Sequence, residues 1–417
     1  MAEHTSFDCD VLIVGAGPAG LALACSLADA GFRCQVVEQA VQAAVEHPAE
    51  DGRDIALTHR GRRIMESLGL WERLPQDVIA PLRAAKVLDG EAQASLLNFS
   101  ASGTGLEALG FLVPNHLIRE AAWQAAQSRP GVNVMCGAAV TGLTLQPDRA
   151  GITLGDGRQL RAPLVVAADS RFSNVRRMAG IGASVHDFAR SVVVGRVTHE
   201  NDSDGIAWEC FRYGNTLAML PMNGRQCSAV ITVDSHQAPE WLALTDAQFV
   251  ERVQAQAPGA LGALKPAGPR HHYPLVGVYA HRFSGHRFAL IGDAAVGMHP
   301  VTAHGYNFGL YGVEVLTQAL QEARAAGKDF GSATVLQRYA DEHRRSTLPT
   351  YLGTNAIVKL FTTELAPVKL ARRAVLAVSE NLPPLNLVIK AAITRQLTGK
   401  TGVSLPGGVG RFGTSPP

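Results

Sequence analysis

Apolar residues at the start of the chain fall into short runs separated by glycine-rich turns. Residues 9–17, CDVLIVGAG, form an apolar run of strand length that ends in a glycine turn. Residues 18–31, PAGLALACSLADAG, place leucines and alanines at helical spacing and end in a glycine typical of a helix carboxyl terminus. Residues 33–39, RCQVVEQ, form a second apolar run. The pattern predicts strand, turn, helix and strand in that order.

The same segment has the length of a membrane span, because Val11 to Ala28 contains no charged residue. Two features argue against a transmembrane helix or a signal peptide. The flank before the run is acidic, and Gly15, Gly17, Pro18 and Gly20 cluster within it. We therefore expect a strand, a turn and a helix instead of a single span.

The predicted turn contains a dinucleotide-binding pattern. Gly15, Gly17 and Gly20 form G-x-G-x-x-G between a strand and a helix. The first glycine allows the tight turn, the second lets the backbone approach a pyrophosphate, and the third allows close helix packing. Glu38 ends the second strand, where a carboxylate can bind a ribose hydroxyl. The alternative is a glycine-rich turn that binds nothing.

The rest of the chain does not continue the regular alternation of strands and helices of a simple dehydrogenase. Helices are predicted near residues 58–68 and within 111–127, and several short strands within 131–169. Two further apolar strands end at a carboxylate, Asp169 and Asp293.

Between residues 190 and 234 the pattern predicts a mostly antiparallel sheet, flanked by one helix from about Glu240 to Gln256. Its apolar wall comprises Trp208, Phe211, Tyr213, Met219, Leu220, Pro221 and Met222. Any one of these could be an ordinary core residue. The stretch from Met219 to Met222 is the part that we expect to face a bound ligand.

From about Thr350 the chain is predicted to be helical and basic, with apolar residues at helical spacing. This region could pack on the dinucleotide-binding domain, or it could meet a membrane surface or a partner. The tail from Gly407, GGVGRFGTSPP, is expected to be mobile.

Composition narrows the class of protein. The chain has 417 residues, 47% hydrophobic and 18% charged, with a net charge of +2. These values are typical of a folded chain of more than one domain and give no support to nucleic-acid binding. The six cysteines show no C-x-x-C spacing, which favours free thiols in a reducing compartment. The histidines show no metal-binding spacing, so no metal is predicted.

Three motifs in order resemble those of the FAD-dependent aromatic hydroxylases built like para-hydroxybenzoate hydroxylase. They are GAGPAG, VVAADSRFSNVRR and LIGDAAVGMHPVTAHGYNFGL, which begin at residues 15, 165 and 290. Within that family the chain is most similar to the ubiquinone-biosynthesis hydroxylases, particularly the 5-demethoxyubiquinol hydroxylase branch.

The resemblance implies an α/β fold, with a Rossmann-like FAD-binding domain, an interleaved and mostly antiparallel substrate domain, and a helical carboxyl-terminal region. The FAD-binding domain would comprise residues 1–75, 110–182 and 280–345. The substrate domain would comprise 76–109 and 183–279, followed by the helical region at 346–417.

The resemblance also implies site residues. Contacts to non-covalent FAD are expected at Gly15, Ala16, Gly17, Ala19, Gly20, Glu38, Arg53, Asn115, Arg119, Asp169, Gly292, Asp293, Pro300, Gly305 and Asn307. The substrate pocket is expected at Phe211, Met219, Leu220, Pro221 and Met222. No protein nucleophile or base is predicted.

The implied activity is hydroxylation of an electron-rich ring through a flavin C4a-hydroperoxide, with NADH or NADPH as a transient reductant and O₂ as co-substrate. The implied substrate is a polyprenylated phenol or quinol. The implied location is cytoplasmic, at the inner membrane surface or in a ubiquinone-synthesis assembly. Alternatives are a reductase of prenyl chains, a hydroxylase of small soluble phenols, and a flavin-binding scaffold without activity.

Several positions depart from the family pattern. The chain has Ser170, Val296, Ala303-His304 and Gly312 where the family has glycine, histidine, glycine-glutamine and an acidic residue. Simpler roles also stay open for four residues: a helix cap for Asp293 or Asn115, a turn for Asp169, and a surface ion pair for Arg53.

Overall fold

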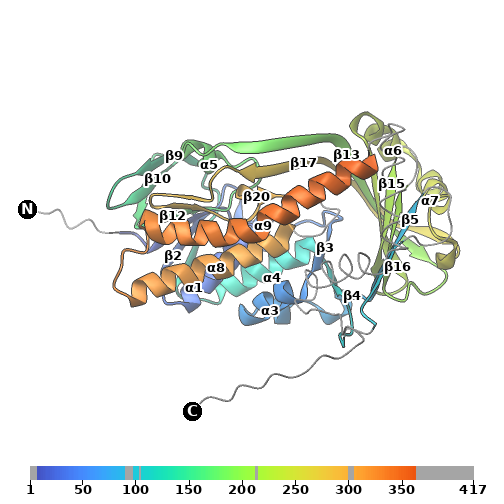
Figure 1. The fold of residues 1–417 in the computed structure, drawn as a ribbon, viewed down its shortest axis with the longest axis horizontal. Helices are drawn as coiled ribbons and strands as arrows, with labels where there is room; N and C mark the ends of the chain where they lie inside the picture. Colours follow the sequence, from blue (N-terminus) through green and yellow to red (C-terminus); the bar gives the residue numbers. More distant parts are fainter. Residues whose placement is uncertain (1–6, 90–96, 103–104, 212–214, 299–304, 363–417) are drawn as a thin grey trace, which may run out of the picture.

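A mostly parallel six-stranded sheet forms the layer that contains the glycine turn. The computed structural model describes residues 7–89, 97–102, 105–211, 215–298 and 305–362. The strand order is β18-β19-β12-β1-β2-β8, and Figure 1 labels two of these strands, β2 and β12. The strands are β1 (Val11–Val14), β2 (Cys34–Val37), β8 (Val132–Met135), β12 (Leu164–Ala167), β18 (Ser284–Gly285) and β19 (Phe288–Leu290). Only β18 is antiparallel to its neighbour.

Four long helices pack beside this sheet. They are α1 (Pro18–Asp29), α4 (Asn115–Gln127), α8 (Gly305–Ala325) and α9 (Ala333–Thr362). Helix α1 packs against α4 and α8, and α8 packs against α9. The predicted end of α1 is confirmed, because Gly31 follows it with φ +80°. The predicted strand, turn, helix and strand are therefore all present.

An eight-stranded sheet forms the second large layer, in the order β20-β17-β13-β16-β15-β14-β5-β6. Its strands are β5 (Ala84–Asp89), β6 (Leu97–Ser100), β13 (Ala183–His199), β14 (Ile206–Phe211), β15 (Thr216–Met222), β16 (Gln226–Asp234), β17 (Leu264–Ala280) and β20 (Val296–Gly297). All pairs are antiparallel except β5 with β14. The predicted antiparallel sheet is confirmed.

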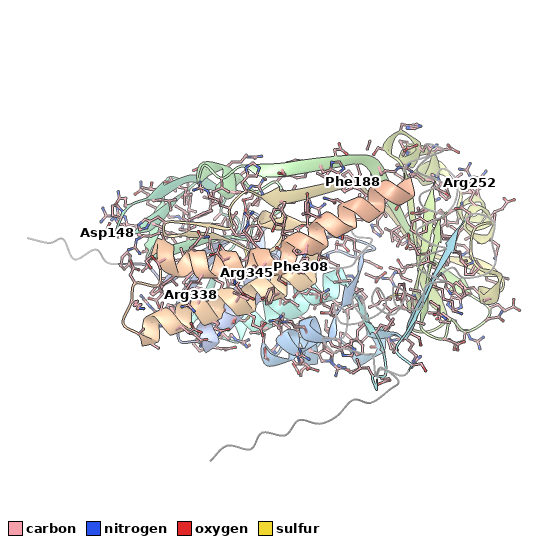
Figure 2. The ribbon with its side chains drawn as sticks, in the orientation of Figure 1. Asp148, Phe188, Arg252, Phe308, Arg338 and Arg345 are labelled. Atoms are coloured by element: carbon pink, nitrogen blue, oxygen red, sulfur yellow. The ribbon has the colours of Figure 1, made fainter. Side chains whose placement is uncertain are left out.

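Two helices, not one, cover the outer face of this sheet. The expected helix from Glu240 to Gln256 is divided into α6 (Ala238–Ala243) and α7 (Asp246–Gln254). The cause is Thr245, whose hydroxyl accepts from Gln248 N while the Gln248 side chain accepts from Thr245 N. This capping box starts a new helix. Figure 2 places Arg252 of α7 at the end of the molecule remote from Arg338 of α9.

Smaller elements connect the two layers. One three-stranded sheet contains β3 (Asp54–Leu57), β7 (Gly110–Pro114) and β4 (Ala80–Leu82), and another contains β9 (Val140–Leu145), β10 (Ala150–Leu154) and β11 (Gln159–Ala162). The short helices are α2 (Gln42–Glu46), α3 (His59–Ser67) and α5 (Asn174–Met178). Thr58 caps α3 by accepting from Gly61 N, close to the predicted start of that helix.

The carboxyl-terminal helix crosses the predicted boundary at residue 346, because α9 runs without interruption from Ala333 to Thr362. Tyr351 and Thr354 on it are buried, and Tyr351 packs on Tyr279 of β17. Among the described residues, no helix is both long enough and apolar enough to cross a bilayer. The predicted mobile tail and the basic region after Thr362 lie outside the described residues. All six cysteines lie in the described ranges, and no disulfide joins any of them there.

A buried histidine explains one departure from the family pattern. A Cβ atom added at Gly312 of α8 would lie 2.7 Å from Cε1 of His343 on α9. His343 is fully buried, with Nε2 3.0 Å from the Phe308 carbonyl oxygen and Nδ1 3.0 Å from the Tyr339 hydroxyl. Burial lowers the pKa of His343 to about 4, so the ring is neutral. The space of an acidic side chain at residue 312 is therefore occupied by this imidazole.

We predict that Gly312→Ala lowers the free energy of unfolding by about 1–3 kcal/mol, the usual cost of overpacking a buried site. The matched control is Gly353→Ala in α9, where an added Cβ meets nothing within 4 Å. That control should raise stability by up to about 1 kcal/mol through helix propensity. Urea denaturation of both variants provides the measurement. Equal stability of the two would contradict the packing argument.

Candidate functional site

The carboxyl ends of β1, β12 and β19 meet at one edge of the six-stranded sheet, where the backbone is packed without side chains. Gly15 has φ +110°, and a Cβ atom on it would lie 2.5 Å from the carbonyl oxygen of Ala168. A Cβ atom on Gly20 would lie 2.0 Å from the carbonyl oxygen of Gly15. Both glycines are therefore required by the protein's own backbone, as the fingerprint predicted.

Gly17 differs from these two glycines, because an added Cβ would meet no protein atom within 4 Å. It is the N-cap of α1, and no side chain caps that helix end or places an acidic group in its first turn. The first N–H groups of α1 are therefore available to an anion. Open space beside Gly17 fits a pyrophosphate that approaches the backbone.

Glu38 fixes the shape of the turn. Its two carboxylate oxygens accept from the backbone N–H groups of Ala16 at 2.7 Å and Ala40 at 2.9 Å. The carboxylate thus lies at the carboxyl end of β2 beside the glycine turn, where the ribose contact was predicted.

A second close approach joins α1 to the turn that follows β19. Gly292 has φ +56°, and a Cβ atom on it would lie 3.0 Å from Ala19 Cβ. A Cβ atom on Gly309 of α8 would lie 3.4 Å from the same methyl group. Ala19 therefore lies between the two glycines as a packing residue, which brings the start of α8 near the glycine turn.

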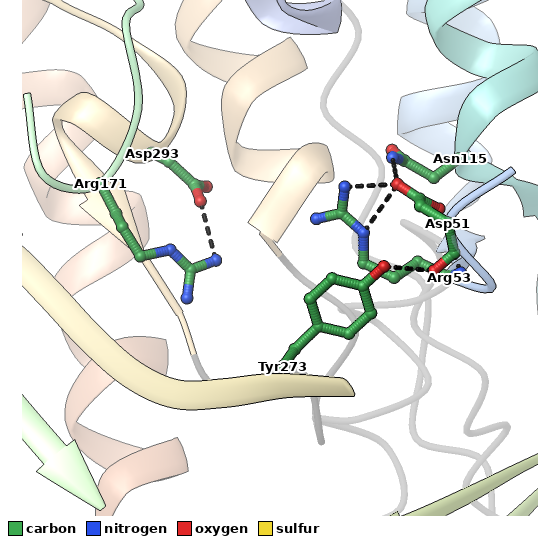
Figure 3. Close-up of polar contacts among 6 residues, drawn as sticks. All are labelled: Asp51, Arg53, Asn115, Arg171, Tyr273 and Asp293. Atoms are coloured by element: carbon green, nitrogen blue, oxygen red, sulfur yellow. Dashed lines mark hydrogen bonds and ion pairs between the residues drawn. The ribbon is translucent and has the colours of Figure 1, made fainter. Parts of the chain in front are cut away.

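Asp293 forms an ion pair with Arg171. The Arg171 Nη2 atom donates to Asp293 Oδ2 at 3.0 Å (Figure 3). The Arg171 Nη1 atom donates to the Val276 carbonyl at 3.0 Å. Asp293 lies in a short 3₁₀ turn (Gly292–Ala294), whereas the described part of α8 begins at Gly305. The described contacts thus assign Asp293 to the ion pair and not to a helix cap.

Asp169 takes part in a local turn. It accepts from the Ser173 hydroxyl at 2.5 Å and from Val175 N at 3.3 Å, and Ser173 in turn caps α5. Ser170, the residue that replaces a family glycine, has φ +130°. A non-glycine residue in that region costs about 1–3 kcal/mol. The loop thus retains a glycine-like conformation without glycine.

Arg53 and Asn115 meet at the carboxylate of Asp51. Arg53 donates to Asp51 Oδ2 from Nη2 at 2.5 Å and from Nε at 3.0 Å, and Asn115 Nδ2 donates to the same oxygen at 2.7 Å (Figure 3). Tyr273 of β17 donates to the Asp51 carbonyl. Burial opposes ionisation of Asp51, but the hydrogen bonds from Arg53 and Asn115 outweigh it and lower its pKa. Arg119 lies one turn after Asn115 on α4 and is partly buried.

Asn307 joins α8 to β3 and to the start of α3. Its Oδ1 accepts from both the backbone N and the hydroxyl of Thr58 at 2.9 Å, and its Nδ2 donates to the Ala56 carbonyl at 2.8 Å. Among the described residues, a Cβ atom on Gly305 would meet nothing within 4 Å. Pro300 lies outside the described residues.

The predicted substrate wall is divided between two faces of the eight-stranded sheet. Leu220 and Met222 pack with Ala80 and Leu112 on the inner face, toward the smaller sheet of β3, β7 and β4. Met219 is fully buried on the outer face, in the hydrophobic core beneath α6 and α7. Because side chains alternate along a strand, Met219 faces away from Leu220 and Met222, which differs from the expectation that residues 219–222 all face one ligand.

Pro221 shares the outer side with Met219 by the same alternation. Phe211 shares the inner side, because Trp208 and Cys210 of β14 belong to the outer core. Tyr213 lies outside the described residues. The inner face therefore retains Phe211, Leu220 and Met222.

Sequence reasoning did not single out three residues of this site, Asp51, Arg171 and Tyr273. Arg171 was visible two residues after Asp169, within the second motif. Asp51 and Tyr273 gave no local signal, since their contacts span 64 and 222 residues. Among the described residues, no three His, Cys, Asp or Glu side chains group closely enough to hold a metal ion.

Known proteins match this chain over most of its length. A family model described as FAD binding domain matches residues 8–347. Ubiquinone hydroxylase UbiM of Neisseria meningitidis is 42% identical, covering 94% of this chain and 85% of its own length. Ubiquinone hydroxylase UbiL of Rhodospirillum rubrum is 37% identical, covering 90% and 87%. The 3-demethoxyubiquinol 3-hydroxylase of Escherichia coli is 29% identical, covering 89% and 94%.

Solved structures share the fold. p-Nitrophenol 4-monooxygenase PnpA of Pseudomonas putida has a TM-score of 0.74 at 18% identity, covering 94% of this chain and 98% of its own. PqsL of P. aeruginosa in complex with 2-aminobenzoylacetate has a TM-score of 0.70 at 22% identity, covering 83% and 93%.

We predict that Gly17→Ala weakens FAD binding at least about tenfold, or about 1.4 kcal/mol, because the methyl group enters space that only the cofactor would fill. Stability without cofactor should change by less than about 0.5 kcal/mol. The control is Gly259→Ala, in the short 3₁₀ turn Gly259–Leu261 that follows α7. An added Cβ at Gly259 also meets no atom within 4 Å. FAD titration followed by fluorescence tests this, and equal affinity of both variants would contradict it.

We predict that Asp293→Ala weakens FAD binding by about 1–3 kcal/mol, the cost of losing a hydrogen-bond partner at a desolvated group. Arg171→Ala is the matched control, since it breaks the same ion pair and keeps the carboxylate. Calorimetric titration of both variants with FAD separates a direct contact of Asp293 with the cofactor from its ion pair with Arg171. Unchanged affinity in a folded Asp293→Ala variant would remove Asp293 from the cofactor site.

Proposed function

The chain belongs to the FAD binding domain family, and on that premise we propose that it is a FAD-dependent monooxygenase that hydroxylates an electron-rich aromatic ring. The predicted membership in a family of FAD-dependent hydroxylases is confirmed. The proposed substrate is a polyprenylated ubiquinone precursor. When bound, FAD supplies the activation of O₂, with NADH or NADPH as the proposed reductant.

The observation behind this proposal is the 42% identity, over 94% of the chain, to a protein named a ubiquinone hydroxylase. The glycine turn supports the cofactor independently. Its open space at Gly17, the uncapped start of α1 and the nearby carboxylate of Glu38 suit a pyrophosphate and a ribose. The residues present therefore fit FAD.

Each layer has a proposed task. The first layer would hold FAD through the α1 terminus, Glu38 and Asp293, and the start of α8 would direct its N–H groups toward the flavin ring. Arg53, Asn115 and Arg119 are proposed cofactor contacts at the edge of that site. In the structure Arg53 is half exposed and paired with Asp51, so contact with FAD would require Arg53 to leave or share that carboxylate.

The inner face of the eight-stranded sheet would cover the substrate and keep water away from the reacting atoms. A small carboxylated phenol would call for a free arginine on this face. Arg196 is on it, but its guanidinium pairs with Asp54 at 3.1 Å and Glu50 at 3.3 Å. Arg225 lies in the turn after β15 and donates to the Glu200 carbonyl. Apolar Leu220 and Met222 favour a prenylated ring instead.

We predict that phenols with an isoprenoid chain are hydroxylated with at least tenfold higher kcat/KM than 4-hydroxybenzoate. Each buried CH₂ group of the chain contributes about 0.8 kcal/mol. The measurement compares product formed with NAD(P)H consumed for both substrates. Equal or better coupled turnover of the soluble acid would refute the prenylated substrate and leave the monooxygenase intact. No oxygen consumption with either would favour the reductase alternative.

Membrane association is a separate part of the proposal. Truncation after Thr362 leaves the buried residues Tyr351 and Thr354 in place, so it removes only the basic region beyond α9. The truncated chain should retain FAD affinity and lose binding to vesicles that contain anionic lipid. Sedimentation with such vesicles tests this, and equal binding of both chains would remove the region from membrane contact.

A further inference from the structure

Glu209 is a carboxylate on the inner face of the eight-stranded sheet. It lies in β14 between Trp208 and Cys210, which both belong to the outer core beneath α6 and α7. Because side chains alternate along a strand, Glu209 points to the opposite side. That side is the one occupied by Phe211 and Leu220, where the substrate is proposed to bind.

The surroundings of Glu209 on this face are small or apolar. Its register partners are Ala218 of β15 and Val87 of β5. Beyond Ala218, the next partner across the sheet is Val230 of β16. None of these side chains can donate a hydrogen bond. Glu209 as a whole residue is partly exposed, so a ligand on this face can approach it.

Within the described residues, Glu209 has neither a hydrogen-bond donor nor an ion-pair partner. Burial alone raises the pKa of its carboxyl group to about 7. Lys86 lies on the outer face, 4.7 Å above the Trp208 ring, and the backbone register pairs Asp89 with Phe211. Arg212 lies outside the described residues. An unpaired carboxylate in apolar surroundings reduces stability, which is typical of a functional group.

We propose that Glu209 is the catalytic base of the reaction, accepting the hydrogen bond and then the proton of the substrate's phenolic hydroxyl. This rests on the proposed function, because a phenol is the substrate that needs such a group. Transfer of the proton increases electron density on the ring, which promotes its attack on an electrophilic oxygen atom.

The phenolic O–H bond breaks and a bond from that hydrogen to the Glu209 carboxylate forms, while the electron pair left on oxygen enters the ring. The ring carbon forms a C–O bond to one oxygen atom of O₂ as the O–O bond breaks. That carbon then loses its hydrogen as a proton, and Glu209 returns its own proton to the ring oxygen. The nicotinamide supplies two electrons together with one hydrogen. That hydrogen, the proton lost from the ring carbon and one proton from solvent complete the new hydroxyl group and the water that carries away the second oxygen atom.

The first experiment is the pH dependence of coupled hydroxylation of a geranyl-substituted phenol. A base acts when it is deprotonated, so kcat/KM of the native enzyme should rise with pH through about 7. Glu209→Gln should lose this rise and fall on the order of 100-fold, whereas Glu209→Asp should retain the rise at lower activity. The control is Glu251→Gln on the exposed side of α7. FAD affinity should be equal in all variants.

The second experiment does not depend on turnover. Binding of the same phenol and of its methyl ether to oxidised holoenzyme is measured by calorimetry, since the ether cannot donate a hydrogen bond. The native protein should prefer the phenol by about tenfold, and Glu209→Leu should not discriminate. If the native enzyme hydroxylates no phenol, the proposed function fails, and this binding preference decides the role of Glu209 alone. An unchanged pH profile in Glu209→Gln, or an unchanged preference in Glu209→Leu, overturns the proposal.

Discussion

The carbonyl oxygen of Ala168 lies where a side chain at Gly15 would have to be. This contact joins the end of β12 to the turn after β1, and Gly20 must also be glycine because α1 crosses the same turn. The second such approach, at Ala19, Gly292 and Gly309, brings the end of β19 and the helix α8 to the same point. The candidate cofactor site therefore depends on backbone packed against backbone, which leaves room for a ligand beside Gly17.

The eight-stranded sheet is positioned over this site by polar contacts from its inner face. Tyr273 donates to the Asp51 carbonyl, and Arg196 pairs with Asp54, whose carboxylate is fully buried. Burial raises the pKa of Asp54. Both contacts are made to residues 51–54, at the start of β3. This short stretch thus positions the eight-stranded sheet over the candidate site, and loss of either partner would leave a buried polar group without compensation.

The sequence permitted prediction of features that are encoded locally. Strand, turn and helix at residues 11–37 follow from apolar spacing and the positions of glycine, and the end of the helix at Gly31 is confirmed. Two further features are also encoded locally and could have been predicted. They are the capping box at Thr245 and Gln248, and the strand alternation that places Met219 and Leu220 on opposite faces. Asp51, Tyr273 and the partner of Asn307 were not, because those contacts join residues far apart along the chain, and tertiary packing brings them together.

Departures from the family pattern have different physical meanings. At residue 312 the missing side chain is replaced by the His343 ring, so the packing is restored by another residue. At residue 170 the backbone keeps φ +130° although serine replaces glycine, so the turn is retained at a cost in strain. Neither change alters the open space at Gly17. Backbone geometry thus accounts for the cofactor site. The side chains on the inner face of the eight-stranded sheet, Glu209 among them, must account for the choice of substrate.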